Sequence, residues 1–551
     1  MEKTIEKASL ILYSNVIDTV SDKGIIAGGI AISGQKILAV ASREMIEKYI
    51  GEDTILKEFF DKLITPGLCE AHMHLFEGAG ADSEYFCSEI VGSKSEADCV
   101  RILKEFATLH PEYPCYIGGG WFPANWNDAP LPSKKSLDEI ISDKPVYLDA
   151  ADFHTTWTNS KALEVSGITK EMAKEIQGID TFPDGELSGI FKENAANLLR
   201  PYPSSVPEDR KDYLMLEMMK RMNKFGITSL ADVSYTKCEA AEELFRPLSR
   251  YLSEGSLPMR LSIYMGQSLE AFDPKELEQL VAYKNAYPDD MLRIPGLKFM
   301  VDGVTSTHTA ALLEPYTDRP DTIGYMNYPE ESYEKAIVEA NRVGLSVRVH
   351  CIGDLAVKKS LDWFEKGAEA ARESGNLSQL YNAIEHIESM AVEDIPRFKE
   401  LNVIASMQPI HLIQDAGEKE YRIGNERCRY EWPVRSLQES GAVLAFGSDF
   451  PVEHYNVFRN LHAAVTRCNS DGKPVGVNVA EETISMEEAI RHYTYGGAYL
   501  MGMEDKLGTL EAGKYADIAV FNCNLLEIEP ENIEKAEAIL TVVNGKIVYE
   551  K

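Results

Sequence analysis

Short runs rich in aliphatic and β-branched residues recur through the middle of the chain, and segments with helical spacing separate most of them. The helical segments include residues 331–341 and 436–440. The strand-like runs are 64–74, 227–233, 260–265, 297–301, 345–350, 382–386, 403–407 and 442–449. These runs number eight, which is the count that closes a parallel (β/α)8 barrel, so the sequence predicts an α/β fold with a TIM-like barrel.

The two ends of the chain and one long connection do not fit this repeat. The connection over residues 75–226 is too long for one βα unit, so we expect an insertion after the first barrel strand, at about 80–220. Both ends carry short strand-like runs, and Asn544-Gly545 is a strong hairpin signal. We expect them to pair into one small β-sandwich domain, formed by residues 1–64 and 506–551 around a barrel at 65–505.

Histidines and an aspartate mark the carboxyl ends of the predicted strands. His72 and His74 lie one residue apart on an extended run, so their side chains point to one face and can hold one ion. The other candidates at strand ends are His350, His386 and Asp449, and Lys298 lies inside a further strand. Each histidine alone could be an ordinary polar or core residue. Because barrel active sites are built at this face, the set predicts a metal site.

Composition narrows the function further. The formal net charge of −32 disfavours binding to nucleic acids or anionic membranes, which require basic patches. No targeting signal and no apolar stretch of about 18 residues is present, so we expect a cytoplasmic protein. The expected partner is a small-molecule substrate. The nine cysteines are scattered without a Cys-x-x-Cys pair, which is typical of reduced thiols. A homo-oligomer such as a dimer is compatible with this composition.

Seven motifs then resemble a known family. They are Lys298–Gly303, Val349–Asp354, Ile384–Ile387, Ser406–Pro409, Gly447–Val452, His154–Ser160 and Gly508–Asp517. Together they resemble the amidohydrolase superfamily of metal-dependent hydrolases, and within it the amidohydrolase-3 branch, which contains enzymes like N-substituted formamide deformylase. The resemblance covers nearly the whole chain.

The resemblance implies a binuclear metal centre. His72, His74 and Asp449 would hold one divalent ion, and His350 and His386 would hold the second. Lys298 would bridge the two ions as an N-carboxylated lysine; the alternative is an unmodified lysine beside a single ion. Imidazole and carboxylate ligands suit Zn²⁺ best, with Mn, Fe or Ni as alternatives.

The same resemblance implies hydrolysis of a carbon–nitrogen bond other than a peptide bond. Two metal ions would generate hydroxide near neutral pH, and Asp449 would act as the general base and then as the acid for the leaving nitrogen. The bond would belong to an amide, a formamide or a cyclic amide. The alternatives are a lactone or ester hydrolase, an isomerase or decarboxylase on the same scaffold, and a non-catalytic metal-bound scaffold.

The candidate substrate-binding residues lie in the insertion and in one barrel loop. Three of the five tryptophans cluster at 118–126 and 153–157, which suggests an aromatic-lined pocket containing Trp121 and Trp157, with His154 and Asn159 as polar anchors. The alternative is that these aromatic residues form the insertion's own core. Asp302 and His308 complete the predicted set, although the branch commonly has arginine at the position of His308.

Overall fold

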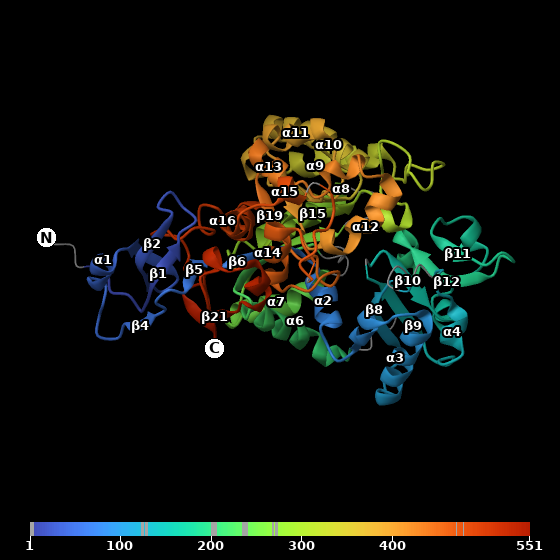
Figure 1. The fold of residues 1–551 in the computed structure, drawn as a ribbon, viewed down its shortest axis with the longest axis horizontal. Helices are drawn as coiled ribbons and strands as arrows, with labels where there is room; N and C mark the ends of the chain where they lie inside the picture. The colour runs from blue at the N-terminus through green and yellow to red at the C-terminus, as the bar shows by residue number, and fades with distance from the viewer. Residues whose placement is uncertain are drawn as a thin grey trace. The chain divides into compact units, whose positions relative to one another are not determined.

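The computed structural model describes residues 5–122, 126, 130–151, 153–199, 206–233, 241–266, 269, 274–469, 471–477 and 479–551. The chain divides into two compact units, one formed by residues 1–75 and 216–551 and the other by residues 76–215. Figure 1 shows the helices and strands of both units.

An eight-stranded parallel sheet forms the TIM-like barrel of the first unit, as the sequence predicts. In barrel order the strands are β6 (Leu68–Met73), β13 (Ile227–Asp232), β14 (Arg260–Gly266), β15 (Leu292–Met300), β16 (Ser346–Cys351), β17 (Ala383–His386), β18 (Ile404–Met407) and β19 (Leu444–Phe446). The ring closes just beyond the last strand, where the backbone N–H of Asp449 donates to the carbonyl of His72 at 2.7 Å.

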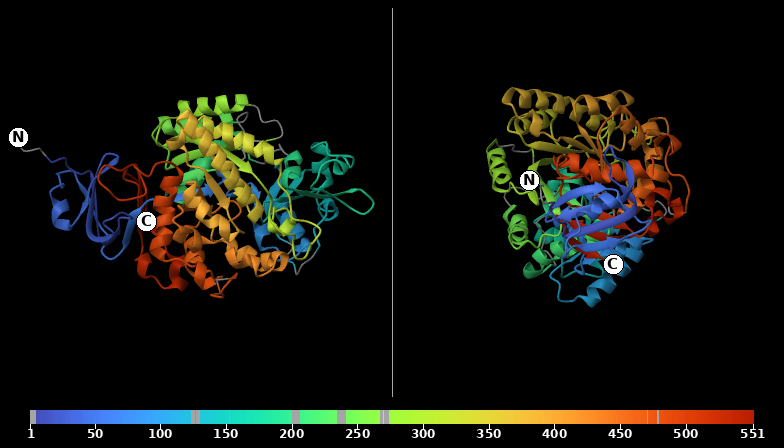
Figure 2. Two further views of the ribbon diagram at one scale, coloured as in Figure 1. Left: turned by 90° about the horizontal axis from the view of Figure 1, so that it is seen from above. Right: turned by 90° about the vertical axis from the view of Figure 1, so that its left-hand side faces the viewer.

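Helices connect the barrel strands and pack outside them (Figure 2). They include α7 (Ala241–Ser253), α8 (Pro274–Ala286), α9 (Glu330–Arg342), α10 (Asp354–Ser374), α11 (Ile395–Glu400), α12 (His411–Ile423), α13 (Val434–Ser440), α14 (Val457–Thr466) and α16 (Met486–Arg491). The predicted helical segments 331–341 and 436–440 correspond to α9 and α13. Strand β15 begins earlier than the predicted 297–301. The prediction began late because Pro295, which has no N–H to donate, interrupts the apolar pattern; the strand continues through it with a register shift against β14.

The two ends of the chain share one sheet, with the order β22-β21-β20-β5-β1-β2-β3 and with β4 paired to β1. Its strands are β1 (Leu10–Asp18), β2 (Ile25–Ser33), β3 (Lys36–Ala41), β4 (Ile55–Glu58), β5 (Leu63–Pro66), β20 (Ile518–Phe521), β21 (Ala538–Val543) and β22 (Lys546–Glu550). Blue and red strands therefore lie side by side in Figure 2. The turn at Asn544-Gly545 has φ of 52° and 76°, which the tight hairpin requires. The predicted curling of these strands into a sandwich stays a prediction.

A buried ion pair ties this sheet to the barrel. The guanidinium of Arg260, on β14, donates to the carboxylate of Asp517 at 2.7 and 3.0 Å, and Arg260 is only 1% exposed. Arg260 also donates to the Asn544 side chain at 2.9 Å. The carboxyl-terminal strands are thus held both by strand pairing and by a bidentate contact to the barrel.

The insertion, residues 76–215, contains its own six-stranded sheet with the order β11-β12-β10-β9-β8-β7. Its strands are β7 (Phe86–Cys87), β8 (Tyr116–Trp121), β9 (Val146–Ala150), β10 (Thr155–Thr158), β11 (Ile179–Thr181) and β12 (Leu187–Lys192). Helices α3 (Glu96–Leu109), α4 (Lys134–Asp138) and α5 (Ser160–Val165) belong to the same unit, and α2 (Leu75–Ala81) and α6 (Glu208–Asn223) span its ends.

Two further predictions can be compared with the described residues. Eight cysteines in the described ranges are free thiols, and Cys238 lies outside the described residues. No helix within the described ranges is both long enough and apolar enough to cross a membrane.

Candidate metal centre

The six predicted metal ligands lie on, or just after, five strands of the barrel, toward the carboxyl ends of those strands. His72 belongs to β6 and His74 follows it, Lys298 belongs to β15, His350 to β16 and His386 to β17, and Asp449 follows β19. All six are buried, and the most exposed of them is Asp449 at 6%. The barrel topology therefore collects residues that are far apart in the sequence at one face.

Asp449 contacts both histidines of the first predicted ion site, His72 and His74. Its Oδ1 lies 3.1 Å from Nε2 of His72 and 3.1 Å from Nε2 of His74. The same-face geometry predicted for the His-x-His pair is therefore present. The two imidazoles and the carboxylate converge on one point rather than projecting separately into solvent.

His386 completes a compact set with His72 and Asp449. One ligand atom from each of these three residues lies within 4.8 Å of the others. The φ angles of His386 and Asp449 are 72° and 60°, in the left-handed region that residues other than glycine rarely adopt. Such backbone strain persists where the surrounding structure imposes it, and it is concentrated at functional sites.

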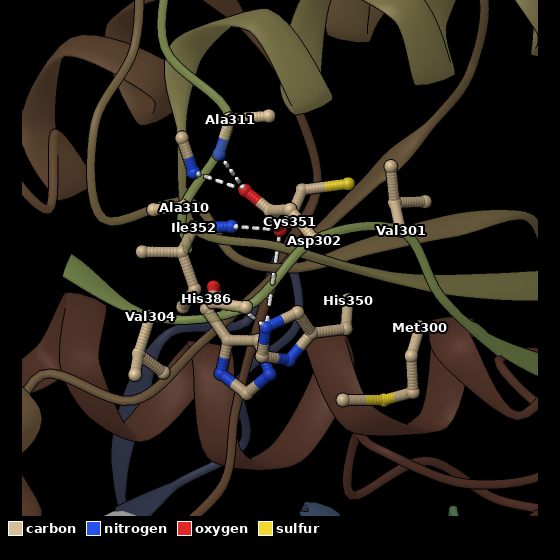
Figure 3. Close-up of polar contacts among 12 residues, drawn as sticks. Met300, Val301, Asp302, Val304, Ala310, Ala311, His350, Cys351, Ile352 and His386 are labelled. Carbon is tan, nitrogen blue, oxygen red and sulfur yellow. Dashed lines mark hydrogen bonds and ion pairs between the residues drawn. The ribbon is translucent and has the colours of Figure 1, made fainter. Parts of the chain in front are cut away.

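His350 lies against His386, with their ring centroids 4.5 Å apart (Figure 3). Nε2 of His350 lies 3.3 Å from the carbonyl oxygen of Gly303, which can accept a hydrogen bond from the Nε2–H group. In that arrangement the remaining ring nitrogen, Nδ1, has the lone pair that a metal ligand needs.

Lys298 is a buried amine, 3% exposed, in the same barrel interior. Burial lowers its pKa to about 8, and nearby Arg348 acts in the same direction, while Glu385 and Asp449 oppose the shift. A lysine can capture CO₂ as a carbamate only when its amine is neutral. The environment of Lys298 therefore favours the form that carboxylation requires.

The donor set fits a divalent cation. Burial lowers the pKa of His72, and burial together with His350 lowers the pKa of His386, so both rings favour the neutral form that coordinates metals. Burial alone would raise the pKa of Asp449, but the neighbouring histidines outweigh it and hold that pKa well below its usual range. Neutral imidazoles beside an ionised carboxylate are the ligand types of zinc sites.

The two predicted substrate residues of the barrel loop, Asp302 and His308, form polar contacts with other residues of the protein. The carboxylate of Asp302 accepts backbone N–H groups from Ala311, Ile352 and Gly353 at 2.9, 3.0 and 2.9 Å, and the residue is fully buried (Figure 3). His308 contacts Asp318 through Nε2 at 2.8 Å, and Nη1 of Arg422 lies 2.9 Å from the same nitrogen. The structure thus places an arginine from α12 beside His308.

The predicted substrate residues of the insertion divide into two groups. Trp121 and Trp157 are 1% and 0% exposed and belong to one apolar cluster, as the alternative of a core role expects. Asn159 caps α5 by accepting the N–H of Ala162 and is also fully buried. His154 is less buried and places Nδ1 2.7 Å from Oε2 of Glu193. Residues 123–125 of the aromatic stretch lie outside the described residues.

Three buried polar residues around the candidate ligands were not predicted from the sequence. Glu385 contacts Nδ1 of His72 through Oε2 at 2.6 Å, Arg348 binds Glu385, and Gln408 contacts Nδ1 of His386 through Oε1 at 2.9 Å. A signal existed in the sequence, because Arg348 is a charge inside an apolar strand and Glu385 directly precedes a predicted ligand. Buried charges of this kind are rare unless they are paired.

Comparison with curated proteins finds relatives over the whole length of the chain. The protein LONG AFTER FAR-RED 3 of Arabidopsis thaliana is 27% identical over 548 residues, which cover 98% of this chain and 92% of that protein. N-substituted formamide deformylase of Arthrobacter pascens is 24% identical over 554 residues, covering 98% of each protein.

Solved structures share the fold. A metal-dependent hydrolase from Pyrococcus horikoshii OT3 superposes with a TM-score of 0.74 at 24% identity, covering 95% of this chain and 99% of that chain. Atrazine chlorohydrolase TrzN from Arthrobacter aurescens TC1, complexed with zinc, superposes with a TM-score of 0.54 at 15% identity, covering 98% and 95%. The family model of the amidohydrolases matches residues 61–549. This chain, whose barrel carries the converging histidines and aspartate, therefore belongs to the amidohydrolase family.

Proposed function

We propose that the protein is a metal-dependent hydrolase that cleaves a carbon–nitrogen bond, other than a peptide bond, in a small molecule. The observation that carries the proposal is the convergence of His72 Nε2 and His74 Nε2 on Oδ1 of Asp449, at 3.1 Å each. A carboxylate in that position can both face a metal ion and reach a reacting water. Membership of the amidohydrolase family supports the same reaction class.

The metal centre would hold two divalent ions, with Zn²⁺ as the first candidate. His72, His74 and Asp449 would hold one ion, and His350 and His386 would hold the other. Lys298, as a carbamate, would supply oxygen ligands to both ions. The zinc in a solved relative with the same fold supports this assignment, as does the mixed imidazole and carboxylate donor set.

When bound, the metal ions supply Lewis acidity, which lowers the pKa of water and polarises a carbonyl group. Asp449 moves the proton in this mechanism. Oδ1 lies 3.1 Å from two histidine nitrogens, whereas Oδ2 is 3.8 Å from Nδ1 of His386, so Oδ2 is the oxygen that would accept a proton from the attacking water. The same oxygen then returns that proton to the leaving nitrogen, which departs as an amine. Burial at the barrel mouth limits competing exchange with bulk water.

The bond that is cleaved would be an amide, a formamide or a cyclic amide. N-substituted formamide deformylase is similar to this chain over 98% of its length. Shorter matches include 5-methylthioadenosine/S-adenosylhomocysteine deaminase, which is 24% identical over 235 residues. Both names describe enzymes that act at carbon–nitrogen bonds, which favours this bond over an ester or a lactone.

A substrate screen on protein of known metal content tests the proposal. The panel should contain N-formyl amines, N-acyl amines and cyclic amides, with matched esters and lactones as a separate arm. We expect stoichiometric release of amine and acid from at least one nitrogen compound, and release slower by about 10²–10⁴-fold in the Asp449→Asn variant. Turnover confined to esters and lactones would replace the proposed bond, and an isomerised or decarboxylated product without water uptake would overturn hydrolysis.

A further inference from the structure

A buried carboxylate lies directly behind one of the candidate metal ligands. Oε2 of Glu385, at the end of β17, is 2.6 Å from Nδ1 of His72, and both residues are at most 1% exposed. On the other side of the same ring, Nε2 faces Oδ1 of Asp449 at 3.1 Å. The imidazole of His72 is therefore held between two acidic side chains, one on the metal side and one away from it.

The chemistry of the two partners gives each ring nitrogen a different role. A carboxylate only accepts hydrogen bonds, and a neutral imidazole has one N–H to donate. The contact to Glu385, at 2.6 Å, is shorter than the contact to Asp449, at 3.1 Å, so the proton of a neutral His72 lies on Nδ1. Nε2 then carries the lone pair and points toward Asp449, where a metal ion would be bound. In metal sites such an outer acceptor sets the tautomer and the ring orientation of the ligating histidine.

Glu385 is itself fixed in place. Arg348, on β16, donates from Nε to Oε1 at 2.6 Å and from Nη2 to Oε2 at 2.9 Å. The same Nη2 donates to the carbonyl of Ala71, the residue before His72, at 2.7 Å. A bidentate guanidinium–carboxylate pair has a defined geometry, so Glu385 cannot turn away from the ring without breaking both bonds.

His386 offers a comparison within the same site. Its Nδ1 contacts Oε1 of Gln408 at 2.9 Å. An amide side chain carries both an acceptor and donors, so this contact is compatible with either tautomer of the ring. Of the two outer partners, only the carboxylate of Glu385 determines which ring nitrogen is left to bind a metal.

We propose that Glu385, held by Arg348, is a positioning residue that keeps the proton of His72 on Nδ1 and directs Nε2 to the metal. The proposal rests on the metal-binding part of the proposed function and not on which bond is cleaved. It assigns the Arg348–Glu385 pair a role beyond filling the barrel interior. A pair with only a structural role would affect unfolding and leave the His72 tautomer and the metal affinity unchanged.

The test uses Glu385→Gln, which keeps the shape of the side chain and removes its charge. The matched control is Glu388→Gln, because Glu388 is a buried carboxylate whose Oε2 lies 2.7 Å from Nζ of the buried Lys419. Both changes remove the anion of a buried ion pair, but Glu385 contacts the ring of His72, whereas Glu388 pairs with Lys419. Arg348→Lys is a second variant, which keeps the positive charge and loses the bidentate hydrogen bonds to Glu385.

Two measurements on the purified full-length proteins decide the outcome. Zn²⁺ affinity, measured by competition with a chromogenic chelator after demetallation, should be about 10- to 100-fold weaker in Glu385→Gln and unchanged in Glu388→Gln. Nitrogen NMR of ¹⁵N-histidine-labelled protein, with His72 assigned by His72→Gln, should show Nδ1 protonated in the wild type and a mixed tautomer in Glu385→Gln.

The proposal is overturned if Glu385→Gln binds Zn²⁺ as tightly as the wild type and keeps the Nδ1 proton. If Glu385→Gln does not fold, Arg348→Lys carries the same test: a weaker Zn²⁺ affinity with a disturbed tautomer supports the proposal, and wild-type values overturn it. Neither measurement involves a substrate, so a failed substrate screen would leave this result unaffected. Normal Zn²⁺ binding by the variants would in turn leave the proposed reaction intact.

Discussion

Oδ1 of Asp449 lies 3.1 Å from Nε2 of His72, and the backbone N–H of Asp449 donates to the carbonyl of His72 at 2.7 Å. The two residues therefore meet through both backbone and side chain, at the seam where the last strand of the barrel returns to the first. Closure of the barrel positions the carboxylate, and the left-handed backbone of Asp449 directs it.

The first prediction separates proton transfer from metal binding at Asp449. Asp449→Asn keeps an oxygen beside the two histidines but removes the base, so kcat should fall by about 10²–10⁴-fold. Metal content should change little because the other ligands remain. Metal analysis and single-turnover rates on one preparation check this. If the variant has lost one ion and excess metal restores the rate, Asp449 is mainly an anchor for that ion.

The second prediction concerns the number of ions. The six candidate positions form a full binuclear set, which predicts close to two divalent ions per chain in the purified protein, and His72→Ala or His350→Ala should lower that number. Elemental analysis measures it. His110→Ala is a suitable control, because this side chain is 28% exposed and belongs to the insertion. Fully active protein that contains no metal would contradict the assignment.

The third prediction is a pH dependence of Lys298 carboxylation. Burial lowers the pKa of Lys298 to about 8 from its ordinary value, so the amine is mostly protonated at about pH 7 and mostly neutral at about pH 9. Recovery of activity after removal of CO₂ and metal should therefore become faster as the pH rises through about 8, when Zn²⁺ and bicarbonate are added and the concentration of dissolved CO₂ is held constant.

A carbon NMR signal from ¹³C-bicarbonate, absent in Lys298→Met, would identify the carbamate directly. Recovery that needs Zn²⁺ but is independent of bicarbonate would show that Lys298 acts as an unmodified residue.

The fourth prediction concerns the sheet shared by the chain ends. Deletion from Gly508 removes β20, β21 and β22 and exposes the edge of β5, so the truncated protein should aggregate or unfold. Asp517→Ala is a milder version of the same test. It leaves Arg260 buried without its carboxylate partner, which should cost about 3–5 kcal/mol of unfolding free energy in denaturant titrations.

The exposed pair Arg319–Asp321 provides the comparison for that measurement. Its side chains are 53% and 67% exposed, so Asp321→Ala should leave the denaturation midpoint nearly unchanged. Equal effects of the two substitutions, or a soluble and active truncation, would show that the contact between sheet and barrel does not stabilise the protein.

The sequence by itself determined the barrel and the strand ends at which the candidate ligands lie. A strand has a side-chain period of two, and parallel strands place their carboxyl ends at one face, so His72, His74 and His386 could be placed at that face from local pattern alone. The hairpin at Asn544-Gly545 was equally local, because its two positive φ angles demand those residue types.

Only the tertiary structure decided which side chains touch. Glu385 and His72 belong to distant segments, and no periodicity encodes their contact; it follows from strand order and register within the barrel. The tryptophans show the same limit, because a pair such as Trp121 and Trp157 can line a pocket or form a core equally well in sequence, and only the structure shows that both belong to one buried apolar cluster. Local pattern sets the strand and the face of a residue, whereas its partner depends on how distant strands are brought together.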